Sequence, residues 1–98
     1  QQNHWLAEHL LALRRFHQQM LHRAEEAMDS MPLEEREVGG VTLRLSRPQV
    51  EHLKKRMYEI RQEILQLDGT GDGAQAVHHF AFQLFPVTDW PSGEPDAS

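Results

Sequence analysis

The chain has 98 residues, no cysteine, and 15 acidic against 10 basic residues, for a formal net charge of −5. This length corresponds to one domain with a modest core, and the lack of cysteine excludes disulfides, thiolate metal sites and a cysteine nucleophile. The basic residues are spread along the chain, and no stretch approaches the roughly 20 apolar residues of a membrane span. We therefore expect a cytoplasmic protein without membrane contact and without direct nucleic-acid contact.

The first predicted element is a helix over residues 3–30. Asn3 is a suitable N-cap, and Pro32 ends the helix because proline cannot continue it. Apolar residues recur at alternating spacings of four and three, which places them on one stripe. The stripe consists of Leu6, Leu10, Leu13, His17, Met20, Ala24 and Ala27. We expect an interface at its N-terminal part, formed by Trp5, Leu6, Leu10, Leu13 and Phe16.

A strand over residues 38–45 and a helix over residues 47–67 are predicted next. Residues 41–45 alternate apolar and polar, which is the period of a strand. Ser46 and Gln49 form a capping pair, in which each side chain accepts a hydrogen bond from the other residue's backbone N–H. The helix carries an apolar seam at spacings of three and four. Its members are Val50, Leu53, Met57, Ile60, Ile64 and Leu67.

After a glycine-rich loop, a second strand is predicted over residues 76–86, followed by a disordered acidic tail over residues 88–98. Phe80 and Phe82 share one face of this strand and are assigned to the core or an interface. No basic residues are interleaved with them, which argues against base stacking. The predicted fold class is α+β, a single domain over residues 1–87. Two strands alone make a poor sheet, so we expect dimerisation to complete it.

The side chains indicate neither catalysis nor a cofactor. The histidines of the first helix lack the spacing of metal ligands, and the loop over residues 68–73 imitates a calcium loop without its closing glutamate. No serine lies on the strained turn that a nucleophile requires. Arg36, between the first helix and the first strand, is expected to bind carbonyl groups of the loop or the helix end. Arg44 and Gln83 are expected to meet on the polar face of the sheet, with ligand binding as the alternative role for all three.

Four stretches resemble a bacterial family of unknown function whose members are described as candidate transcriptional regulators. In that family this domain follows a helix-turn-helix-like N-terminal region. The resemblance spans Phe16 to Val87. It is carried by His17, Met20 and Ala24, by Glu35-Arg36-Glu37 with Val41-Thr42-Leu43-Arg44-Leu45-Ser46, by Arg61 and Leu65, and by Gln83-Leu84-Phe85-Pro86-Val87.

The resemblance implies that this chain is the non-catalytic dimerisation or sensory part of a regulator, with DNA bound through an N-terminal region that is missing here. The chain begins with Gln, which also indicates a piece of a longer protein. Two alternatives stay open. One is a stand-alone module that docks a partner helix on the first helix's stripe, and the other is a sensor of a small ligand or a metal.

Overall fold

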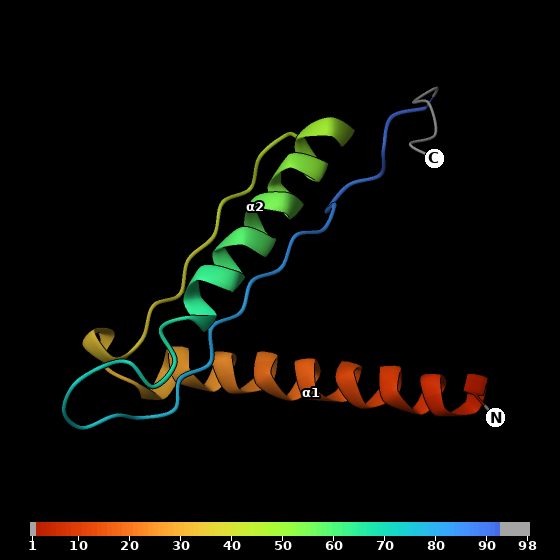
Figure 1. Cartoon of the computed structure of the whole chain (residues 1–98). Helices are drawn as coiled ribbons and strands as arrows, with labels where there is room; N and C mark the ends of the chain where they lie inside the picture. The colour runs from red at the N-terminus through yellow and green to blue at the C-terminus, as the bar shows by residue number, and fades with distance from the viewer. Residues whose placement is uncertain (1, 93–98) are drawn as a thin grey trace. The chain divides into compact units, whose positions relative to one another are not determined.

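The computed structural model describes residues 2–92. It contains α1 (Gln2–Ser30), the short 3-10 helix η1 (Leu33–Glu35) and α2 (Arg47–Leu65), in that order (Figure 1). The chain divides into two compact units, Gln1–Val41 and Thr42–Ser98. The first unit holds α1 and η1, and the second holds α2 and a long extended run that follows it.

The predicted fold class, α+β, is wrong: the described residues form two α-helices and no strand, so the fold is all-α. Residues 38–45 and 76–86 alternate apolar and polar as predicted, but neither forms a β-bridge within residues 2–92. An extended segment becomes a strand only when its backbone bonds to a neighbouring segment. The alternation of apolar and polar residues predicts which way the side chains of an extended segment point. It does not show that a second segment lies beside it.

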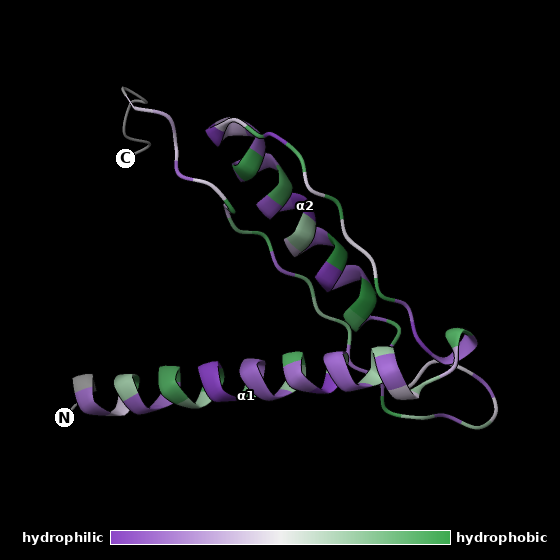
Figure 2. Ribbon diagram, turned by 180° about the vertical axis from the view of Figure 1, so that it is seen from behind, coloured by the Kyte–Doolittle hydropathy of each residue, from purple (hydrophilic) through white to green (hydrophobic). Residues whose placement is uncertain are grey.

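The helix predicted over residues 3–30 is α1, which has 29 residues. Ala, Leu, Gln, Glu and Arg dominate its composition, and these residues lose little side-chain freedom in a helix. Figure 2 shows apolar and polar residues alternating along it. We call the seven stripe residues Leu6, Leu10, Leu13, His17, Met20, Ala24 and Ala27 the α1 seam. Its leucines, His17 and Ala24 are exposed, and Met20 and Ala27 are half-buried.

Local hydrogen bonds close the C-terminal end of α1. The Ser30 hydroxyl donates to the Glu26 carbonyl at 2.9 Å, and the Met31 N–H donates to the Ala27 carbonyl at 3.1 Å. Arg36 Nε donates to the Met31 carbonyl at 3.0 Å. Carbonyl groups at the end of a helix lack partners within the helix, so these contacts satisfy part of that end and fix the turn that follows.

The second helix begins at the predicted capping pair, which is confirmed. The Ser46 hydroxyl accepts from the Gln49 N–H at 3.4 Å, and Gln49 Oε1 accepts from the Ser46 N–H at 2.9 Å. Pro48 lies in the first turn, where its missing N–H is not needed. The helix ends at Leu65, two residues before the predicted end, and Gly69 follows with a φ of 73°.

The extended run over residues 76–90 returns alongside α2, antiparallel to it, in both views (Figures 1 and 2). Four members of the predicted α2 seam are half-buried: Val50, Leu53, Met57 and Ile64. From the run itself, Leu84 and Trp90 are also half-buried. Phe82 of the run shares a hollow with Met57 of α2, and Trp90 contacts Arg47. The run therefore lies against part of α2, although no described residue from 4 to 92 is fully buried.

Candidate functional site

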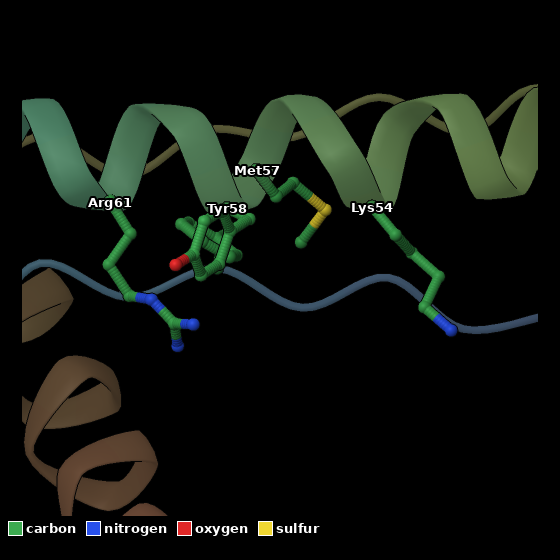
Figure 3. A pocket seen from close by; sticks show the side chains of 5 residues that line it. Lys54, Met57, Tyr58 and Arg61 are labelled. Carbon is green, nitrogen blue, oxygen red and sulfur yellow. The ribbon is translucent and has the colours of Figure 1, made fainter.

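An open hollow lies between α2 and the extended run. It has a volume of about 180 Å³ and is lined by Lys54, Met57, Tyr58 and Arg61 of α2 and by Phe82 of the run. In Figure 3, Met57 and Tyr58 lie between Lys54 and Arg61, whose side chains both extend away from the helix. The hollow thus has an apolar and aromatic floor with a cation at each end. We call this set of five residues the α2 hollow.

Aromatic rings accompany the cations of this surface. The Arg61 guanidinium carbon lies 5.7 Å from the centre of the Tyr58 ring. Nearer the start of the helix, the Arg47 guanidinium carbon lies 4.0 Å above the centre of the Trp90 ring. Cations are attracted to the electron-rich faces of such rings. The Arg47–Trp90 contact also holds the end of the extended run against the first turn of α2.

The charges around the hollow are only partly compensated. Lys54 Nζ lies 3.8 Å from a carboxylate oxygen of Glu51, at the outer limit of an ion pair. Arg56, outside the hollow, bonds more closely to Glu59, with 2.6 Å between Nη1 and Oε1. Exposed pairs of this kind contribute little to stability. The cationic ends of the hollow therefore remain available to an anionic group in solution.

The sequence pattern does not predict this site. No basic residue is interleaved with Phe82 along the chain, but the fold places Phe82 beside Lys54 and Arg61 of α2. One signal is present in the sequence: Arg47, Lys54 and Arg61 recur every seventh residue. On a helix, that spacing returns to nearly the same face.

The residues predicted to form an interface fall in both units. Trp5, Leu6, Leu10, Leu13 and Phe16 lie on α1 with exposures between 43% and 65%. The Trp5 ring stacks on His9 at 5.3 Å between centroids. Phe80 and Phe82 lie in the extended run, in edge-to-face contact at 5.8 Å. Phe82 is the more covered of the two, at 38% against 59% exposed.

Of the three predicted polar residues, Arg36 lies in the first unit, and Arg44 and Gln83 lie in the second. Arg36 bonds to the carbonyl of Met31, as described above. Arg44 and Gln83 lie in extended segments, and within residues 2–92 no hydrogen bond joins them. The sheet face on which they were expected to meet is absent from the described residues.

The histidines and acidic residues of the described chain form no group of three that could hold a metal ion. His4 Nε2 lies 2.9 Å from a carboxylate oxygen of Glu8, and His17 contacts Phe16 edge-on. Of the tail predicted over residues 88–98, residues 93–98 lie outside the described part. Neither helix in residues 2–92 combines the length and the apolarity needed to cross a lipid bilayer.

Comparison with known proteins gives one result. Residues 9–87 match a family described as a domain of unknown function, DUF4423. No curated protein and no solved structure matches the chain. The match covers the α1 seam from Leu10 onward, α2 and the extended run to Val87, which is most of the chain. This chain therefore belongs to the family of the domain of unknown function DUF4423.

Proposed function

We propose that this chain is a non-catalytic assembly domain that forms a homodimer through α1. The observation that carries the proposal is the exposed α1 seam, an apolar stripe along a helix of 29 residues. Most helical stability in proteins comes from packing an amphipathic face against another element. A second copy of the same chain offers an identical apolar face.

The exposure of the seam leucines supports this proposal. Leu6, Leu10 and Leu13 are 48%, 56% and 43% exposed. A contact with a second copy along α1 would cover them.

We further propose that the domain serves as the C-terminal part of a cytoplasmic bacterial transcriptional regulator. This wider role depends on the sequence resemblance described above, in which DNA is bound by a region N-terminal to this domain. A net charge of −5 suits a part that does not itself contact DNA. No catalytic role is included, because the Ser30 and Ser46 hydroxyls already serve the ends of the two helices.

The test is the absolute molar mass of the 98-residue chain, measured by light scattering after size exclusion. We expect twice 11.4 kDa, with the mass unchanged over a tenfold dilution. A mass of 11.4 kDa at high micromolar concentration would overturn the proposed dimer. A filter-binding measurement with duplex DNA is expected to show no affinity, and salt-dependent binding would contradict the proposed division of roles.

The α2 hollow favours a second candidate function, the sensing of a small molecule that combines an apolar part with an anionic group. Its apolar floor and its two cationic ends suit a molecule that carries a ring and a carboxylate or phosphate. Binding would raise the thermal unfolding temperature of the chain, because a ligand that binds the folded state stabilises it. No shift with any of a panel of aromatic carboxylates and phosphates would remove this candidate.

A further inference from the structure

The α1 seam has an uneven distribution of side-chain volume. Its N-terminal half carries Leu6, Leu10 and Leu13, and its C-terminal half ends in Ala24 and Ala27. The spacing of four and three is the heptad pattern of helices that pack side by side, with knobs of one helix inserted between residues of the other. The order of large and small residues along the seam therefore favours one direction and one register for pairing with α1 of a second copy.

A parallel pair would match this seam poorly. Each seam residue would lie opposite its own copy, so the leucines would gather at one end of the pair and the alanines at the other. Ala24 and Ala27 would also face their own copies, which leaves space between the helices. Close packing instead favours large residues opposite small ones.

We propose that α1 pairs antiparallel with α1 of a second copy, in a register in which Leu13 lies opposite Ala24 of the other chain. This inference rests on the proposed dimer. In the same register Leu10 lies opposite Ala27, and Leu6 lies opposite Met31. Because the pairing is two-fold symmetric, each contact occurs twice. Every seam leucine then faces an alanine or a methionine of the other chain.

The residues at the centre and edges of the seam agree with this register. His17 lies opposite Met20 of the other chain, at the centre of the seam. Arg23 flanks Phe16 of the other chain, a pairing in which the cation can meet the ring. A shift by one heptad, with Leu6 opposite Ala24, would place the two Arg14 side chains opposite each other at the edge. Like charges in contact disfavour that alternative.

Met31 supports the register in which it lies opposite Leu6, because it directly follows α1 and bonds back to the last turn of that helix. Its N–H donates to the Ala27 carbonyl at 3.1 Å, and its side chain is exposed. Arg36 Nε holds the Met31 carbonyl at 3.0 Å. The residue that would cover Leu6 of the other chain is therefore fixed at the end of α1.

The absence of cysteine makes disulfide cross-linking a clean test. Leu13→Cys and Ala24→Cys chains are prepared separately, mixed in equal amounts, unfolded and refolded together, and oxidised with glutathione disulfide. Mass spectrometry then distinguishes the mixed dimer from the two self-linked dimers. We expect the mixed dimer to exceed either self-linked species by at least tenfold. Light scattering of the reduced variants confirms that they still associate.

Other results of this experiment would show whether the direction of pairing, the register, the interface or the dimer itself is wrong. Self-linking of Leu13→Cys as efficient as mixed linking would overturn the antiparallel arrangement. Cross-linking of Leu6→Cys with Ala24→Cys in place of the expected pair would overturn the register. A dimer by light scattering that cross-links in none of these mixtures would show an interface elsewhere on the chain. A monomer would overturn the proposed function itself, and this inference with it.

Discussion

The two helices of this protein have similar apolar seams and different surroundings. The α2 seam lies in one unit with an extended run that returns along it, and four of its residues are half-buried. The α1 seam has three exposed leucines, and two of its seven residues, Met20 and Ala27, are half-buried. This difference agrees with the proposal that α1 pairs with a second copy, whereas α2 is covered in part by its own chain.

The ends of the helices show a related difference. The start of α2 is fixed by the reciprocal pair Ser46 and Gln49, and Arg47 holds Trp90 of the returning run. At the end of α1, Ser30 and Arg36 bond to carbonyl groups in the same part of the chain. Local contacts therefore define where both helices stop or start, and α2 also gains a contact from the distant Trp90.

The largest expected effect comes from charging the α1 seam. In Leu10→Glu/Leu13→Glu, a dimer would lose four buried leucines, each of which stabilises it by about 1.5–3 kcal/mol. We expect no dimer at micromolar concentration and a loss of helical circular dichroism, because α1 then has no partner. The matched control, Gln18→Glu/Gln19→Glu, adds the same charge on the polar side of α1. Equal behaviour of the two variants would contradict the account.

A smaller effect is expected from Phe82→Ala in the second unit, where the Phe82 side chain is 38% exposed. Its loss should lower the free energy of unfolding by about 1–2 kcal/mol, which is less than the value of about 3–5 kcal/mol for a fully buried phenylalanine. Urea denaturation measures this change, and the molar mass should stay that of the wild type.

The control for Phe82→Ala is Phe85→Ala, because the Phe85 side chain is 68% exposed. This substitution should change the free energy of unfolding by less than about 0.5 kcal/mol. Equal losses of stability in the two variants would show that the extended run is not held against α2 through Phe82.

The capping pair of α2 contributes less. Ser46→Ala removes the hydroxyl that accepts from the Gln49 N–H. The loss of such a cap should cost about 1 kcal/mol of stability. Chemical denaturation at fixed chain concentration gives the value. Thr42→Ala, in the extended segment before the helix, serves as the reference and should be nearly neutral. A Ser46→Ala chain as stable as the wild type would show that the cap is not needed.

The smallest expected effect is that of the contact between Arg47 and Trp90. A cation over an aromatic ring at an exposed site is worth about 0.5–1 kcal/mol. A double-mutant cycle with Arg47→Gln and Trp90→Leu isolates the interaction from other effects of each change. Tryptophan fluorescence of the Trp5→Phe chain should respond to Arg47→Gln, since Trp90 is then the remaining tryptophan. A coupling energy of zero would mean that the extended run is held by apolar contacts alone.

Sequence reasoning succeeded for the helices because their signals are local. The spacing of Leu6, Leu10 and Leu13 and the pair Ser46 and Gln49 lie within a few residues of one another. The family was also identified at the level of a domain of unknown function, which the match over residues 9–87 confirms. The regulator context of that family stays a proposal.

Sequence reasoning failed where the outcome depends on distant segments. The alternation of residues 41–45 and 76–86 predicted strands, but a strand needs a neighbour, which the described chain does not provide. The α2 hollow was missed because Lys54 and Phe82 are far apart in sequence and meet only after the run returns along α2. In both cases the missing information is the path of the chain between elements.

The most direct test of the central claim is amide hydrogen exchange at chain concentrations above and below the dimer dissociation constant. If a second copy covers the α1 seam, protection in α1 should fall on dilution, while protection in α2, which its own chain covers, should stay constant. Protection in α1 that does not depend on concentration would contradict the account, as would an equal loss in both helices.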